Sequence, residues 1–194
     1  MGTIRAFVAV ELPEPVKSQI GQIGRKLQAG AWARAVKWVE PAQMHITLKF
    51  LGDVDAARLP AVEDALRGAA AQHVPFAIRL AGLGTFPGGP RLRVVWIGLD
   101  EGEAQLVALT ADVESALNTL GFKPERHEAH PHVTLGRVRD WAGTPERRAF
   151  GDALRALAVP EFPRAPVDHI NLMQSHLSPQ GARYQVLAAA SLRG

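Results

Sequence analysis

The chain has 194 residues, of which 47% are hydrophobic and 21% are charged, and its formal net charge is +3. This composition is ordinary for a folded protein and allows one large domain or two small lobes. The absence of cysteine excludes disulfides, thiolate metal sites and a cysteine nucleophile. No stretch reaches the roughly 18 apolar residues of a membrane-spanning helix, and the N-terminus lacks a signal-peptide pattern. We therefore expect a cytoplasmic protein without a membrane partner.

The first half of the chain is predicted to alternate between strands and helices. Pro13 and Pro15 lie at the start of the first helix, where a missing N–H costs little. Apolar residues recur at helical spacing in both helices of this half, and β-prone runs separate them. The predicted elements are strands over 4–12, 36–39 and 44–51, and helices over 13–30 and 54–72.

The second half continues this alternation and ends in two strands. Thr144, Pro145 and Glu146 form a typical helix start, with an N-cap residue, a proline in the first turn and an early acid. The last two strands are predicted to form a hairpin with its turn at 178–181. The predicted elements are strands over 76–86, 91–99, 132–138, 167–177 and 184–192, and helices over 105–120 and 144–158.

One tetrapeptide pattern, His, β-branched residue, Thr, Leu, occurs at 45–48 and again at 132–135. Alternate side chains of a strand point to opposite faces, so the His and Thr of each copy would share one face. A single histidine on a strand is usually a surface or core residue. Two copies would supply an acid, a base and two hydroxyl donors if both faced one cleft.

The repeat extends upstream of the two tetrapeptides. A strand with Phe7 and then a helix precede the first copy, and a strand with Trp96 and then a helix precede the second. A strand–helix–strand unit used twice predicts two pseudo-symmetric lobes whose motif strands face one cleft. No linker-like composition separates the units, so we expect a single bilobal domain over 1–194.

These blocks resemble the two-histidine (2H) phosphoesterase superfamily, and within it the RNA 2',3'-cyclic phosphodiesterase family, also called 2'-5' RNA ligase. The resemblance covers nearly the whole chain, and no motif position departs from it. It is carried by the opening strand at 5–13, Lys37-Trp38-Val39, the extended motifs at 45–52 and 131–137, and Ser175-His176-Leu177 with Gly181 and Tyr184.

The resemblance implies an α+β fold of two lobes, with antiparallel sheets lining a central cleft and helices outside. It implies metal-independent hydrolysis of RNA 2',3'-cyclic phosphate ends, such as those of tRNA halves, to a 2'-phosphate, and reversible ATP-independent 2'-5' ligation. It makes His45 the proton donor to the leaving oxygen and His132 the proton acceptor. Thr47 and Thr134 would donate hydrogen bonds to the phosphate. No cofactor is implied, and we expect a monomer.

Two basic residues close to the motifs are candidates for binding the substrate. Arg137 could pair with a phosphate as a two-pronged donor, although a solvated arginine is an equal alternative. Strand alternation predicts Lys49 on the face of His45 and Thr47, where it would reach the cleft.

Four further residues are weaker candidates for binding the substrate. Phe7 and Trp96 occupy matching places in the repeat and could stack on a base, although buried packing is the simpler role for both. Ser175 and Tyr184 are candidates because they belong to the signature of the family that the chain resembles.

Other functions remain open from the sequence. The segment 127–132 holds three histidines and one glutamate and could form a metal site, but its spacing fits no helical ligand pattern and Pro131 opposes a helix. No Lys-Ser or Lys-Thr follows the glycine-rich 82–89, which disfavours a P-loop. The alternatives to RNA-end hydrolysis are a sibling enzyme for another cyclic phosphate or a 2'-5' oligonucleotide, and a non-catalytic RNA-end-binding module. His73, His169 and His176 receive no role.

Overall fold

The computed structural model describes residues 2–125, 129–178 and 181–193. Its strands are β1 (Thr3–Glu11), β2 (Val36–Trp38), β3 (His45–Asp55), β4 (Phe76–Phe86), β5 (Val94–Glu101), β6 (Val133–Val138), β7 (Ala165–Val167), β8 (His169–Ser178) and β9 (Gly181–Ser191). Its helices are α1 (Glu14–Gln28), α2 (Leu59–Ala70), α3 (Glu103–Thr119) and α4 (Thr144–Ala156).

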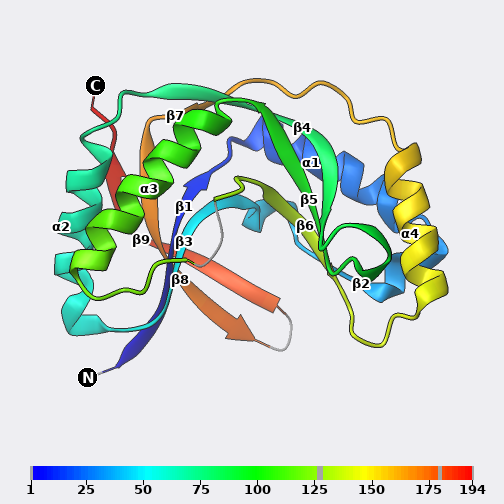
Figure 1. The fold of residues 1–194 in the computed structure, drawn as a ribbon, viewed down its shortest axis with the longest axis horizontal. Coiled ribbons are helices and arrows are strands. Elements are labelled where there is room, and N and C mark those ends of the chain that lie inside the picture. Colours follow the sequence, from blue (N-terminus) through cyan, green and yellow to red (C-terminus); the bar gives the residue numbers. More distant parts are fainter. Residues whose placement is uncertain (1, 126–128, 179–180, 194) are drawn as a thin grey trace.

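The strands pair side by side in the order β7-β4-β5-β6-β3-β1-β8-β9, and β2 pairs with β6. All of these pairs are antiparallel. The sheet curls strongly, with the helices on its outer side (Figure 1). This arrangement confirms the predicted α+β fold, with one difference: the two lobes share a continuous sheet because β3 and β6 pair at Ile46 and Val133.

Each lobe contains one end of this sheet. The first lobe comprises β1, β3, β8 and β9, and α2 and α3 lie against it (Figure 1). The second lobe comprises β2, β4, β5, β6 and β7, and α1 and α4 lie on its side (Figure 1). The helix of each predicted strand–helix–strand unit therefore covers the lobe to which its own first strand does not belong. Both helices bury the apolar faces that their helical spacing predicts, with Val16 and Ile20 of α1 and Leu109 and Val113 of α3 fully buried.

The predicted ends of several elements differ from the observed ones. β3 continues past Gly52 to Asp55, with Gly52 in a left-handed conformation at φ +70°, where the sequence predicts an end. α2 begins at Leu59 instead of 54, so that Pro60 lies in its first turn. The predicted hairpin joins β8 to β9, and Pro179 and Gln180 of its turn lie outside the described residues.

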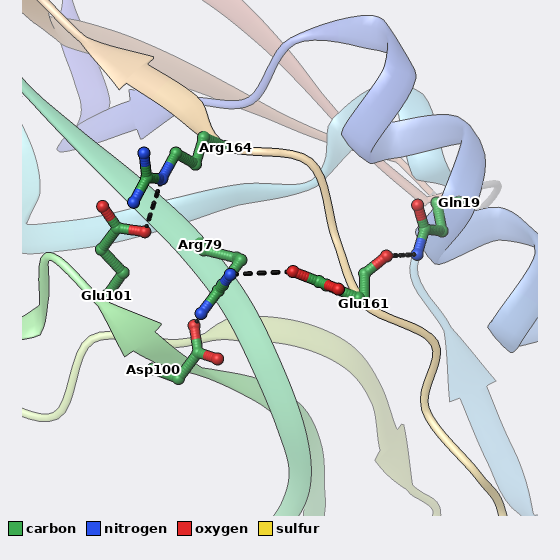
Figure 2. A network of polar contacts seen from close by, with 6 residues as sticks. All are labelled: Gln19, Arg79, Asp100, Glu101, Glu161 and Arg164. Carbon is green, nitrogen blue, oxygen red and sulfur yellow. Dashed lines mark hydrogen bonds and ion pairs between the residues drawn. The ribbon is translucent and has the colours of Figure 1, made fainter.

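A polar network fastens the segment after α4 to the outer side of the second lobe (Figure 2). Arg79 donates to Asp100 at 2.9 Å and to Glu161 at 2.9 Å, and Arg164 donates to Glu101 at 2.8 Å. The side chain of Gln19 in α1 donates to the carbonyl of Glu161 at 2.8 Å. The network is exposed, so it positions this segment more than it stabilises the fold.

Within the part of the chain that the structure describes, no helix is long and apolar enough to cross a membrane.

Candidate active site

The two tetrapeptides lie beside each other at the centre of the sheet, where the lobes join. Ile46 of β3 pairs with Val133 of β6, and both side chains are fully buried. Because the pair is antiparallel, this register sets Thr47 opposite His132, and His45 opposite Thr134. Each histidine therefore neighbours the threonine of the other motif.

Both motif strands carry a bulge at the last position of the tetrapeptide. In the pairing of β3 with β1, Thr47 faces Ala9 and Lys49 faces Val8, which leaves Leu48 as the extra residue. In the pairing of β6 with β5, Leu135 is left out in the same way. A bulge reverses the alternation of the side chains that follow it. The residue five positions after each histidine is thereby turned onto the face of that histidine.

The first bulge makes the predicted position of Lys49 wrong. Lys49 is 1% exposed and lies on the opposite side of the sheet, where its ammonium donates to Glu114 at 2.6 Å and to the carbonyl of Lys123 at 2.9 Å. Phe50 takes the place on the cleft face and contacts Phe7 there, with 6.1 Å between the ring centroids.

The same backbone contact fixes the orientation of both histidine rings. Nδ1 of His45 is 2.9 Å from the carbonyl oxygen of Gln43, and Nδ1 of His132 is 2.7 Å from that of His130. A carbonyl oxygen can only accept, so Nδ1 carries the hydrogen in each neutral ring. Nε2 is then the nitrogen left to exchange protons with a substrate, as acceptor when neutral and as donor when protonated.

His45 lies between aromatic rings of the first lobe. Its ring centroid is 4.9 Å from that of Phe7 and 5.1 Å from that of Tyr184. Burial lowers the pKa of His45 below its ordinary value, and the charge of Lys17 adds to this. The contact with the Gln43 carbonyl and the charge of Glu11 oppose the lowering of this pKa.

His132 lies in a matching aromatic surround of the second lobe. Phe86, Trp96 and His130 have ring centroids 5.2, 6.0 and 6.3 Å from its own. Burial is again the main cause that lowers the pKa of His132, and the charges of His130 and Arg137 lower it further. Its contact with the His130 carbonyl opposes this effect.

The remaining predicted site residues lie around these two rings. Arg137 is exposed, and its charge lowers the pKa of both His132 and Tyr184. Its charge therefore influences site residues of both lobes. Burial nevertheless raises the pKa of Tyr184 overall. Ser175 of β8 is paired in register with Tyr184 of β9.

Phe7 and Trp96, which occupy matching places in the repeat, pack against different neighbours. Phe7 is 3% exposed and packs against His45. Trp96 lies flat over Gly84, where an added Cβ would come within 2.1 Å of the indole ring. Its ring centroid is 4.7 Å from that of His130. Only a residue without a side chain at position 84 leaves room for this ring, which explains the glycine there.

Sequence reasoning missed some residues of this site. Phe86 and the backbone carbonyl of Gln43 carry no signal of their own in the sequence, which indicates His130 only as a possible metal ligand. The common rule is visible afterwards: the residue two positions before each motif histidine supplies the carbonyl for its Nδ1. His127 and Glu128 of the alternative metal cluster lie outside the described residues, and the described ones contain no group of three or more potential ligands.

Comparison with known proteins identifies the family to which the chain belongs. The sequence profile of the 2'-5' RNA ligase superfamily matches residues 13–179. The RNA 2',3'-cyclic phosphodiesterase of Methanothermobacter thermautotrophicus is 34% identical over 181 residues, which are 93% of this chain and 95% of the relative. That of Aquifex aeolicus is 32% identical over 195 residues, with both chains covered completely.

Solved structures agree with these relatives. The crystal structure of the Thermus thermophilus protein TT0787 superposes with a TM-score of 0.78 at 29% identity, covering 98% of this chain and 99% of the other. Escherichia coli LigT complexed with 3'-AMP superposes with a TM-score of 0.73 at 26% identity, covering 99% of each chain. The profile, the relatives and the fold therefore agree that this chain belongs to the 2'-5' RNA ligase superfamily.

Proposed function

We propose that this chain hydrolyses the 2',3'-cyclic phosphate at the end of an RNA and leaves a 2'-phosphate. The observation that carries the proposal is the pair of histidines on adjoining strands. In each, a carbonyl holds Nδ1, and Nε2 has no hydrogen-bond partner among the described residues. Relatives that match nearly the whole chain are named for this activity, which supports the same reaction here.

In the proposed reaction the two histidines have unequal roles. His132 takes a proton from water through Nε2, and the water oxygen forms a bond to phosphorus. The bond between phosphorus and the 3'-oxygen breaks, and His45 gives its proton to that oxygen. The products are a 2'-phosphate and a free 3'-hydroxyl. The charges near His132 all oppose its protonation, whereas those near His45 partly cancel, which supports this division.

We assign Thr47 and Thr134 the role of hydrogen-bond donors to the non-bridging phosphate oxygens. Each lies opposite the histidine of the other motif in the register of β3 and β6, a suitable position for holding phosphorus between the two rings. Arg137 would add a charged donor on the same face, since no carboxylate partner is found for it among the described residues.

The same machinery with a 5'-hydroxyl as the nucleophile would join RNA ends. A 5'-hydroxyl would take the place of water, and attack on the cyclic phosphate would form a 2'-5' bond without ATP. His132 would accept the proton of the 5'-hydroxyl, and His45 would again protonate the 3'-oxygen. The name of the superfamily supports this second activity.

We further propose a single bilobal domain over 1–194 that acts as a monomer in the cytoplasm, on RNA fragments such as tRNA halves. The shared sheet supports one unit, because β3 and β6 join the lobes. The absence of cysteine is compatible with a reducing compartment.

The test is product analysis with a short RNA that ends in a 2',3'-cyclic phosphate, in the presence of EDTA. We expect a 2'-phosphate product at an undiminished rate. A 3'-phosphate product, or loss of activity with EDTA that added metal restores, would contradict the proposal.

A further inference from the structure

A cavity of about 270 Å³ opens beside His45 in the first lobe. Its position next to the proposed proton donor makes it a place for part of the substrate. Its walls combine opposite charges with apolar groups, a combination typical of sites that bind an aromatic heterocycle. The lining residues used below are Glu11, Gln43, His45, Met173, Arg183 and Tyr184.

One wall of the cavity accepts hydrogen bonds. Oε2 of Glu11 accepts from Nδ2 of Asn171 at 2.9 Å, while Oε1 has no hydrogen-bond partner among the described residues. The carboxylate fixes the orientation of the amide, because only Nδ2 can donate to it. Asn171 is 2% exposed and does not line the cavity, so its amide holds the carboxylate from behind. The Glu11 carboxylate therefore has spare capacity to accept from N–H groups in the cavity.

The rest of the lining donates hydrogen bonds or packs. Arg183 is exposed on β9 and has no carboxylate partner among the described residues, so its guanidinium is free to donate. Met173 is 4% exposed and belongs to the apolar cluster with Phe7 and Ala9, against which Tyr184 packs. These groups offer apolar surface to the face of a flat ring.

Guanine is the RNA base that fits both walls. Its N1–H and N2–H₂ groups are adjacent donors that one carboxylate can accept together, and its O6 and N7 atoms are the acceptors that arginine recognises. Adenine and cytosine offer a single amino group to a carboxylate, and uracil a single N–H. We infer that this cavity binds a guanine base, with Glu11 as the residue that sets the preference; this rests on the proposed function.

The cavity also indicates which nucleotide of the RNA supplies the base. His45 lines the cavity and, in the proposed reaction, protonates the 3'-oxygen of the terminal ribose. The base in the cavity is then the one attached to that ribose. The chain would act on RNA fragments that end in guanosine 2',3'-cyclic phosphate in preference to other ends.

The test compares kcat/KM for the 2',3'-cyclic phosphates of guanosine, adenosine, cytidine and uridine. We expect the wild type to prefer guanosine about tenfold or more, the discrimination usual for one two-pronged contact. Glu11→Gln should abolish the preference, because an amide presents a donor where guanine needs a second acceptor. Any effect of this variant on the pKa of His45 is common to the four substrates and cancels in their ratio.

Glu14→Gln is the matched control, since Glu14 is an exposed acid in the first turn of α1 and does not line the cavity. It should keep the guanosine preference. Equal kcat/KM for all four substrates, or an unchanged preference in Glu11→Gln, would overturn the inference while leaving the hydrolase proposal standing.

Binding provides a readout that does not need turnover. Calorimetry should show 2'-GMP binding about tenfold more tightly than 2'-AMP to the wild type, and equally to Glu11→Gln. If neither these cyclic phosphates nor the short RNA with a cyclic phosphate end is hydrolysed, the proposed function fails, but the binding preference still decides the inference. Equal affinity of the wild type for the two monophosphates would overturn it.

Discussion

The two motif histidines have the same backbone support but different surroundings. Both rings are fixed by the carbonyl two residues earlier, and both lie at the start of a strand whose bulge falls on the motif leucine. The charges near His132 come from His130 and Arg137, and both lower its pKa. His45 has Lys17 and Glu11 nearby, with opposite effects on its pKa. The backbone thus holds the two histidines in the same way, and the charged side chains around them make their pKa environments different.

The residues that follow the two bulges extend this difference. Lys49 and Gly136 occupy equivalent positions on the outer side of the sheet, and Phe50 and Arg137 occupy equivalent positions on the cleft side. The first lobe therefore presents an aromatic ring where the second presents a cation. We interpret the second lobe as the one that adds positive charge to the phosphate site, and the first as the one that holds the nucleoside.

The largest expected effect comes from removing either histidine. His45→Ala and His132→Ala should each lower kcat for cyclic phosphate hydrolysis by about 10³-fold, because each removes one proton-transfer group. His169→Ala is the matched control, since His169 lies at the start of β8 beside Asp168, and should keep full activity. A motif variant that keeps wild-type kcat would refute the two-histidine mechanism.

A smaller loss is expected from the threonines. Thr47→Val and Thr134→Val keep the shape of the side chain and remove the hydroxyl, so each should lower kcat by about 10²-fold through loss of one donor to the phosphate. Steady-state kinetics would check this. If the two variants act only on folding, their kcat per folded molecule will match the wild type.

Substitutions behind the motifs should change stability and leave catalysis alone. Lys49→Ala leaves Glu114, whose side chain is 19% exposed, without its cation, and should lower the free energy of unfolding by about 3 kcal/mol. Urea titration would measure this. The double variant Lys49→Met with Glu114→Leu should recover much of the loss, because it removes both charges. A fall in kcat of folded Lys49→Ala would contradict this account, because it would indicate that Lys49 acts in the cleft.

Gly136→Ala tests the equivalent position of the second lobe. An added Cβ there would come within 2.7 Å of the Val36 side chain and 3.1 Å of the Lys37 carbonyl. We expect destabilisation, because β2 is packed against β6 at this point and its backbone must move to make room. Differential scanning calorimetry would detect a lower Tm. An unchanged Tm would contradict this expectation, because it would show that β2 can move without loss of stability.

Much of the fold follows from local patterns that the sequence displays. The helical spacing of Val16 and Ile20 and the proline and acid at the start of α4 predict helices close to where they are found. The α+β class and the two similar units also follow from the repeat. The crossing of α1 and α3 to opposite lobes does not, because it depends on how the curled sheet buries each apolar face (Figure 1).

Less of the site could be predicted. The repeated pattern of His and Thr is enough to select His45, Thr47, His132 and Thr134. The apolar residue between His and Thr in each motif pairs with its counterpart, Ile46 with Val133, and this pairing brings the two motifs together. The position of Lys49 was wrong because a bulge breaks the period of two, and no residue type marks it. The partnership of Glu11 with Asn171 joins strands far apart in the sequence, so only the fold reveals it.

The proposed division of roles is tested most directly by pH profiles of kcat/KM for two variants that each remove one positive charge. The productive form has His45 protonated and His132 neutral, so the alkaline limb reports His45 and the acidic limb reports His132. Lys17 lowers the pKa of His45 and Arg137 lowers that of His132. Removing either charge raises the pKa of its neighbour. We predict that Lys17→Gln moves the alkaline limb to higher pH and that Arg137→Gln moves the acidic limb to higher pH. The opposite assignment, with Arg137→Gln moving the alkaline limb and Lys17→Gln the acidic one, would contradict the account.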